Sequence, residues 1–116
     1  MLYNVSKKKT ILNKVKIADT EFKQALGLMF SRRSKFNYCL IFSRPTSSII
    51  GSSIHMMFVF YPITVIFLDE NKKVVDIKKK VIPFWFYAPK KPAKYILEMP
   101  TSTNINSVNV NDRFKW

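Results

Sequence analysis

The feature that most constrains the fold of this chain is an apolar run from Ile54 to Leu68, which contains Pro62 and ends at Asp69. A helix needs about 20 consecutive apolar residues to cross a bilayer, and this run is shorter. Its Val, Ile and Phe content is typical of buried strands, and a proline cannot donate to a strand ladder. We therefore expect strands over residues 56–60 and 63–68, in the core of the protein and not in a membrane.

Periodic patterns on both sides of this run predict further strands and one helix. After a hairpin turn at residues 69–72, apolar and charged residues alternate over residues 74–82, which is the period of a half-buried strand. An amphipathic helix capped by Thr20 is predicted by apolar residues at helical spacing, namely Phe22, Ala25, Leu26 and Met29. Shorter strands are expected over residues 11–18, 38–42, 95–99 and 112–116, and loops over residues 43–53 and 83–92.

The length and the order of these elements predict the fold class. A chain of 116 residues is long enough for one core and too short for two. Several strands with one clear helix indicate an α+β domain. We expect a mostly antiparallel, strongly curled sheet that forms a partly open β-barrel, with one or two short helices. Residues 1–10 are interpreted as a basic, flexible leader, and residues 11–116 as the single domain.

The charge balance is unusual, with 20 Lys and Arg against 7 Asp and Glu and a net charge of +13. Such a charge attracts anionic partners, which include nucleic acids, acidic proteins and anionic lipid headgroups. The same lysine content, together with many Asn, Ile, Phe and Tyr residues, is also typical of proteins from AT-rich genomes. The sequence leaves both explanations open.

Cysteine usage and the N-terminal residues bear on the compartment. Cys39 is the only cysteine, so no disulfide can form within the chain, which fits a reducing compartment. The N-terminal residues contain no apolar segment of signal-peptide length before their lysines. We therefore expect a cytoplasmic protein.

Three motifs give the chain a resemblance to a known family. The first is Gly27-Leu28-Met29, followed by arginine and then by Leu40-Ile41-Phe42. The second runs from Ile54-His55-Met56 through Pro62-Ile63 to Leu68-Asp69 and Val74-Val75, and the third is the stretch 95–100 followed by Asp112. In this order and at this spacing they resemble the domain of unknown function 192 family (DUF192), a family of uncharacterised conserved proteins. The second motif, together with Pro83-Phe84-Trp85, is similar to the archaeal members.

The resemblance implies a small, partly barrel-like α+β domain and brings no established activity, ligand or cofactor. Members of the family usually carry an aspartate where this chain has Thr64, and glycines where it has Thr101 and Asn111. Any role of that aspartate in relatives, as a ligand or in a turn, is therefore not transferred to this chain.

Residues that commonly carry catalysis or bind metals are few. His55 is the only histidine, which excludes sites with two imidazole ligands, and two glycines are too few for a phosphate-binding loop. A nucleophile–base pair of Cys39 with His55, or a Cu(I) site of His55 with methionines 29, 56 and 57, is chemically feasible. A structural histidine, a buried cysteine and core methionines explain the same residues more simply. We predict no catalytic residue, no metal and no cofactor.

The remaining candidates have the side chains that recognition surfaces use, which are guanidinium forks and flat aromatic faces. Glu98, between Leu97 and Met99, is expected to face either solvent or a pocket that contains Arg32 or Arg33. Trp85 fits a recognition surface or the cap of a barrel end. The candidate ligand-binding residues are Arg32, Arg33, His55, Trp85 and Glu98.

The sequence thus favours a non-enzymatic domain that binds a small ligand or a protein partner. A nucleic-acid-associated basic protein is the alternative, which a dependence of binding on salt tests. An enzyme of unknown reaction, with His55 as its base, is the second alternative.

Overall fold

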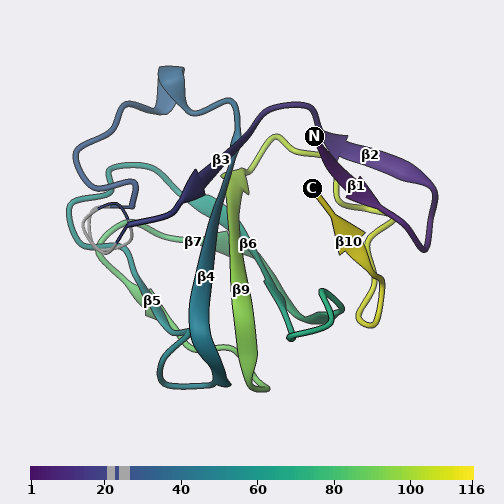
Figure 1. The fold of residues 1–116 in the computed structure, drawn as a ribbon. Helices are drawn as coiled ribbons and strands as arrows, with labels where there is room; N and C mark the ends of the chain where they lie inside the picture. The colour runs from purple at the N-terminus through teal and green to yellow at the C-terminus, as the bar shows by residue number, and fades with distance from the viewer. Residues whose placement is uncertain (21–22, 24–26) are drawn as a thin grey trace.

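The computed structural model describes residues 1–20, 23 and 27–116, and this part of the chain folds into strands that form three sheets (Figure 1). A short 3₁₀ helix, η1, spans Arg33–Lys35. The strands are Leu2–Asn4 (β1), Lys9–Leu12 (β2), Val15–Ala18 (β3), Cys39–Ser48 (β4), Ile54–His55 (β5), Ile63–Leu68 (β6), Val74–Val81 (β7), Phe86–Tyr87 (β8), Ala93–Pro100 (β9) and Phe114–Lys115 (β10).

The central sheet has five strands in the order β3-β4-β9-β6-β7. Its neighbouring strands are antiparallel except for β3 and β4, which are parallel. All six residues of β6 are buried, because both faces of the sheet are covered by other parts of the chain. A strand with two covered faces has a continuous apolar sequence rather than an alternating one, and this explains the run at residues 63–68.

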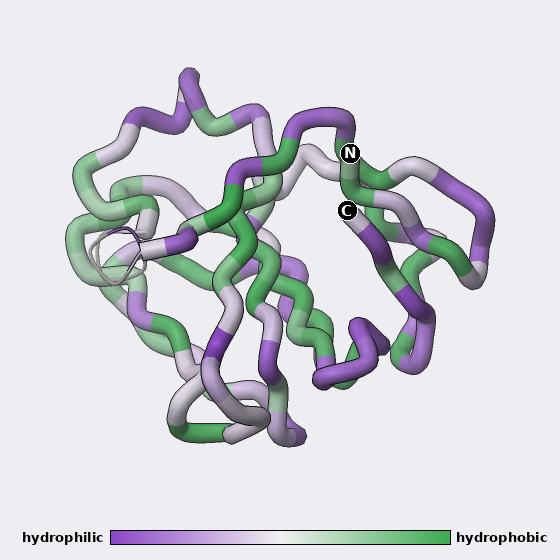
Figure 2. Tube along the Cα trace, in the orientation of Figure 1, coloured by the Kyte–Doolittle hydropathy of each residue, from purple (hydrophilic) through white to green (hydrophobic). Residues whose placement is uncertain are grey.

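Each face of the central sheet packs against a separate layer. One face packs against the turns around η1 and the two-stranded sheet β5-β8, which contribute Leu28, Phe36 and Ile54 to the core. The other face packs against the sheet β10-β1-β2, which contributes Leu2 and Phe114. Figure 1 shows the two layers on opposite sides of β4, β9 and β6. The hydropathy colouring of Figure 2 is mostly green in the upper halves of β4 and β9, and purple at the β1–β2 and β6–β7 connections.

The expectation of an α+β domain with a strongly curled, partly open barrel is wrong. The five-stranded sheet is open, with β3 and β7 as its edges, and in the described part of the chain no sheet closes or curls strongly. A barrel buries its interior by closing one sheet on itself. Here two separate layers cover the two faces of the sheet, so closure is not needed to bury them.

The helical content of the described residues is also smaller than expected. η1 has three residues. The predicted helix rested on Phe22, Ala25 and Leu26, which lie outside the described residues. The side chain of Thr20 accepts a hydrogen bond from the backbone N–H of Lys23 at 3.0 Å, and Met29 lies in a turn.

The segment that we interpreted as a flexible leader, residues 1–10, contains β1 and the beginning of β2. β1 pairs with both β2 and β10, and the side chain of Leu2 is fully buried. The side-chain amide of Asn4 donates to Asp112 at 2.9 Å, and the ammonium group of Lys7 lies 3.0 Å from the same carboxylate. The first residues of the chain are thus tied to its last strand.

Most of the other predicted strands are confirmed, with different ends. The hairpin of β6 and β7 and the turn at Asp69 are confirmed, since the backbone N–H of Asp69 donates to the carbonyl oxygen of Lys73 across the turn at 2.9 Å. Residues 11–18 divide into β2 and β3, which belong to different sheets. The strand expected over residues 56–60 is wrong, because the backbone turns there and Phe58 has a φ of 60°.

Candidate functional site

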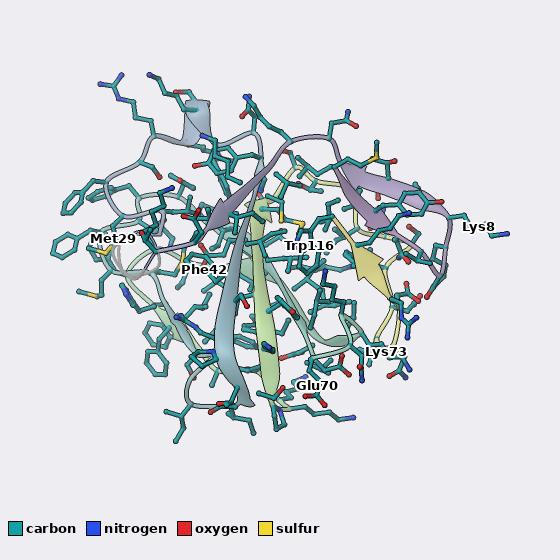
Figure 3. The ribbon with its side chains drawn as sticks, viewed as in Figure 1. Lys8, Met29, Phe42, Glu70, Lys73 and Trp116 are labelled. Carbon is teal, nitrogen blue, oxygen red and sulfur yellow. The ribbon has the colours of Figure 1, made fainter. Side chains whose placement is uncertain are left out.

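Six aromatic side chains are exposed on three turns at the β5–β8 end of the molecule, and we call this group the aromatic surface. Their exposed fractions range from 42% for Phe58 to 66% for Phe86. Figure 3 shows aromatic rings that project outward from the edge on which Met29 is labelled. The members of the aromatic surface are Phe30, Phe58, Phe60, Phe84, Trp85 and Phe86.

The rings of the aromatic surface contact one another. Phe58 stacks on Phe30 with ring centroids 5.1 Å apart and meets Phe84 edge-on at 6.1 Å. Phe84 also meets Phe60 edge-on at 5.4 Å, and Trp85 stacks on Phe86 at 5.6 Å. Aromatic pairs in these geometries contribute about 0.5–1.5 kcal/mol each beyond the area they bury. The four phenylalanines, Phe30, Phe58, Phe60 and Phe84, therefore form one connected cluster.

Backbone hydrogen bonds join the three turns that present these rings. The N–H of Phe30 donates to the carbonyl oxygen of Phe58 at 2.9 Å. The N–H of Phe84 donates to the carbonyl oxygen of Met56 at 2.8 Å, and the N–H of Met56 donates to the carbonyl oxygen of Trp85 at 2.6 Å. The turn at residues 56–60 thus lies between the other two and is fastened to both.

Three of the phenylalanines have a left-handed backbone conformation. The φ angles are 62° for Phe30, 60° for Phe58 and 60° for Phe84. For a residue with a Cβ atom this conformation costs about 1–2 kcal/mol, and glycine or asparagine usually occupies it. Backbone strain of this kind persists only where surrounding contacts hold it, and it is concentrated at functional sites. The strain in the three turns is therefore a reason to examine this surface for function.

The segments that form this end of the molecule carry cations and no carboxylate. Residues 27–36, 54–62 and 82–88 include Arg32, Arg33 and Lys35 but neither Asp nor Glu. The two arginines and Lys35 are exposed and follow Phe30 closely along the chain. The aromatic surface is therefore adjacent to positive charge.

Four of the five residues predicted as a binding site belong to these segments. His55 is exposed on β5, where it pairs with Phe86 of β8, and its Nδ1 accepts a hydrogen bond from the N–H of Met57 at 3.3 Å. Trp85 is tied to the neighbouring turn through its carbonyl oxygen. Arg32 and Arg33 lie at the start of η1. The structure thus places Trp85 directly before β8, the strand that pairs with His55 of β5, and places the arginines shortly after the turn that contains Phe30.

Glu98 lies apart from the other four, in the interior. It is on β9, where it pairs with Leu40 of β4 and with Val65 of β6, and its side chain is buried. Burial raises the pKa of the Glu98 carboxyl to about 8, although the positive charge of Arg44 acts in the opposite direction. The cation that acts on this carboxyl is thus Arg44, whereas the sequence suggested Arg32 or Arg33.

A pocket of about 370 Å³ lies at the β3 edge of the central sheet. The ammonium group of Lys16 lies 4.2 Å from the ring centroid of Tyr38 at this pocket. None of the five predicted residues lines it. Its walls are Lys16, Ile17, Ala18, Lys23, Gly27, Tyr38 and Leu40.

The described residues bear on one catalytic alternative and on one class of metal site. Cys39 is fully buried, and burial raises the pKa of its thiol, which opposes formation of a nucleophilic thiolate. Within residues 1–20, 23 and 27–116, no three His, Cys, Asp or Glu side chains lie close enough together to hold a metal ion. No helix in the same part of the chain is long and apolar enough to cross a membrane.

The fold and the site define a small β-sheet domain that presents an aromatic, cation-bordered surface at one end. The chain belongs to the DUF192 family, whose description is Uncharacterized ACR and whose profile matches residues 3–116. The family that the three motifs indicated is thus confirmed.

The similar proteins come from archaea and bacteria. A UPF0127 protein of Pyrococcus furiosus is 45% identical over 99% of this chain and 97% of its own length. A UPF0127 protein of Thermococcus sibiricus is 42% identical over 100% of this chain and 74% of its own length. A crystal structure of a protein of unknown function from Novosphingobium aromaticivorans has a TM-score of 0.80 and 20% identity, over 99% of this chain and 81% of that one. At this level of identity the likeness shows the fold alone.

From sequence, Trp85 and Phe86 have the flat rings of a recognition surface, and of the aromatic surface only Trp85 was among the five candidates. Phe58 and Phe60 were assigned to a buried strand because they lie in the apolar run. Phe84 was noted in the stretch Pro83-Phe84-Trp85 and was not among the candidate residues. No local signal marks the turns, because Phe30, Phe58 and Phe84 stand where glycine or asparagine would have indicated a left-handed backbone.

Proposed function

We propose that this protein is a non-enzymatic binding module that contacts its partner through the aromatic surface. The observation that carries the proposal is the combination of exposed, mutually contacting rings with three strained turns. Contiguous exposed apolar patches on single chains often mark interaction sites. A surface that served only to complete the core would bury these rings in relaxed turns.

The contacts between the turns also favour binding over a role as a loose loop cluster. The backbone hydrogen bonds from Phe30, Met56 and Phe84 hold the rings in one arrangement before any partner arrives. Binding then requires little further ordering of side chains and backbone, which preserves affinity. We therefore treat the aromatic surface as a pre-organised site.

A nuclear magnetic resonance titration of the ¹⁵N-labelled protein with 8-anilino-1-naphthalenesulfonate tests this proposal. The probe is an aromatic anion, so it matches both the rings and the adjacent cations. We expect amide shift changes confined to residues 28–33, 55–60 and 84–87. Shift changes centred on Lys16 and Tyr38 instead would assign binding to the pocket at β3, and changes scattered over the lysines would indicate charge alone; either result contradicts the proposal.

A matched pair of variants controls for general hydrophobic binding. Phe60→Ser removes an exposed ring from the aromatic surface, and Val110→Ser removes an exposed apolar side chain near β10. Neither position has a positive φ. We expect Phe60→Ser to weaken probe binding several-fold and Val110→Ser to leave it unchanged. Equal effects of the two substitutions would contradict a localised site.

A further inference from the structure

The aromatic surface offers a partner hydrocarbon rather than hydrogen-bonding groups. The phenol of Tyr61 is buried and lies 2.6 Å from the hydroxyl of Ser31. The phenol of Tyr87 donates to Asp76 at 2.6 Å. The two phenols of the three turns are thus engaged within the protein, and the exposed groups include the phenyl rings, the indole of Trp85, the side chain of Met57 and the imidazole of His55.

The cations beside these rings lack neighbouring acids along the chain. Arg32, Arg33 and Lys35 are exposed, and the segments of this surface contain neither Asp nor Glu. Glu70, which belongs to the β6–β7 turn, is labelled on the side of the molecule away from Met29 in Figure 3. A partner that covers the Phe30 end of the aromatic surface therefore also meets positive charge, because the three cations follow Phe30 within five residues.

We propose, on the premise that the aromatic surface is the binding site, that its partner is the surface of an anionic lipid bilayer. The rings of the three turns enter the boundary between the headgroups and the acyl chains, where aromatic side chains are stable and the indole N–H remains hydrated. Arg32, Arg33 and Lys35 contact headgroup phosphates. The protein then lies on one leaflet as a peripheral protein.

The charge pattern argues against a second copy of this chain as the partner of the aromatic surface. In a two-fold symmetric interface the same patch contacts itself. Arg32 and Arg33 would then approach their own counterparts with no carboxylate from these segments to neutralise them, in a protein of net charge +13. An anionic bilayer supplies the missing negative charge.

The ring contacts disfavour single-stranded nucleic acid. Proteins that bind it stack successive bases on free aromatic faces. Here Phe30 and Phe58 stack on each other, and so do Trp85 and Phe86. Each of these rings has one of its two faces against its neighbour, which leaves less face area for bases, whereas insertion into a bilayer requires only exposed edges and apolar surface.

Sedimentation with vesicles tests the proposal through a pair of variants with equal charge. The vesicles contain phosphatidylglycerol and phosphatidylcholine in equal parts, or phosphatidylcholine alone, in 0.15 M salt. Arg32→Ser with Arg33→Ser removes two charges beside the aromatic surface. Lys8→Ser with Lys9→Ser removes two exposed charges from the β1–β2 turn, and the net charge of both variants is the same. Since each cation near an anionic leaflet contributes about fivefold in affinity, we expect roughly a 30-fold loss for the arginine variant and little change for the lysine variant.

Fluorescence tests the insertion of the rings. The chain has 2 tryptophans, so Trp116→Phe leaves Trp85 as the single reporter. We expect a blue shift of its emission and protection from acrylamide when anionic vesicles are added. Phe60→Ser in the same background is expected to weaken vesicle binding several-fold, and Val110→Ser is expected to have no effect.

The outcomes separate this proposal from the proposed function. Probe binding at the aromatic surface without binding to either kind of vesicle would overturn the lipid proposal and leave the binding module in place. Absence of both would overturn both. Equal losses in the arginine and lysine variants would reduce vesicle binding to net charge and overturn the lipid proposal. The lipid proposal would also be overturned if an oligothymidine shifted the amide resonances of residues 28–33, 55–60 and 84–87 while vesicles did not.

Discussion

The backbone N–H of Phe30 donates to the carbonyl oxygen of Phe58 at 2.9 Å, and the rings of the same two residues stack 5.1 Å apart. Both residues have a positive φ. Two turns that are far apart in the sequence are therefore joined by a main-chain contact and a side-chain contact, each made from a strained backbone. The favourable contacts between the turns offset the conformational cost within them.

The first prediction measures that cost at Phe58. Phe58→Ala and Phe58→Gly both remove the ring, and they differ only in the Cβ atom. Glycine adopts a φ of 60° without penalty. We expect the glycine variant to be more stable than the alanine variant by about 1 kcal/mol in urea unfolding. At Phe60, whose φ is not positive, we expect the alanine variant to be more stable than the glycine variant. If Phe58→Ala is at least as stable as Phe58→Gly, the backbone at Phe58 is not strained.

The second prediction concerns the dependence of stability on pH through Glu98. Burial raises the pKa of its carboxyl from 4.5 to about 8 in the folded protein. Below the pKa that this carboxyl has in the unfolded chain, Glu98 is protonated in both states, and the free energy of unfolding is not reduced by its ionisation. Stability is lost progressively as the pH rises through the folded pKa, because the unfolded chain releases the proton more easily. We expect the free energy of unfolding to fall between about pH 5 and pH 8 by a few kcal/mol.

Glu98→Gln is the control for this titration. The amide is close in size to the protonated carboxyl and does not ionise. We expect the variant to lose most of the decrease between pH 5 and pH 8, so that its stability relative to the unmodified protein improves as the pH rises. Identical pH profiles for the two proteins would show that Glu98 does not titrate as its burial implies.

The part of the fold that could be predicted from sequence is the part that local patterns determine. The apolar residues 63–68, the acidic turn at Asp69 and the alternation after Val74 predicted the β6–β7 hairpin. The same apolar signal failed at residues 56–60, because a run of Met, Phe and Val does not reveal that Phe58 has a positive φ. Local patterns also do not show whether a sheet closes into a barrel or stays open with a separate layer on each face.

The candidate site depended still more on contacts between distant segments. Residue types and loops indicated Arg32, Arg33, His55 and Trp85, and all four lie in the segments of the aromatic surface. Glu98 was grouped with them, although its place on β9 directs it to the interior near Arg44. The register of β4, β9 and β6 decides that placement, and no spacing within one segment encodes it.

The third prediction concerns the link between the two ends of the chain at Asp112. Burial alone would raise the pKa of this carboxylate, but hydrogen bonds from Asn4, from the backbone of Asn109 and from Lys7 lower it below 3.8. Asp112→Ala leaves the buried amide of Asn4 without its acceptor, so we expect a loss of about 2–3 kcal/mol.

Lys7→Ala serves as the comparison for Asp112→Ala. It removes only the partly exposed cation, and we expect a loss of about 1 kcal/mol or less. Urea unfolding at pH 7 measures both variants. The Asp112 carboxylate stabilises the folded state only while it is ionised. The stability difference between the unmodified protein and Asp112→Ala should therefore decrease as the pH falls below about 4. Equal losses in the two variants would show that the exposed ion pair, and not the buried amide contact, ties the ends together.

The fourth prediction concerns Thr64, where the family resemblance led us to expect an aspartate. β6 and β7 lose register here, since Ile63 pairs with Val81 and Val65 pairs with Lys78, so Thr64 faces two residues of β7. Its hydroxyl donates to the carbonyl oxygen of Lys79 at 2.7 Å, in a site that is 2% exposed. The Thr64 hydroxyl thus provides a hydrogen bond to the carbonyl oxygen of Lys79 at the point where the register of the two strands is interrupted.

An ionised aspartate has no proton to donate to that carbonyl, and a valine has no hydroxyl. We expect Thr64→Ser to be nearly neutral and Thr64→Val to lose about 1–2 kcal/mol. Thr64→Asp should lose more at pH 7, because it buries a carboxylate against a carbonyl oxygen. Relative to the unmodified protein, Thr64→Asp should recover stability as the pH falls and the carboxyl becomes a donor. Unfolding in urea at pH 4.5 and pH 7 measures this recovery, and its absence would mean that the hydroxyl of Thr64 contributes nothing as a donor at the bulge.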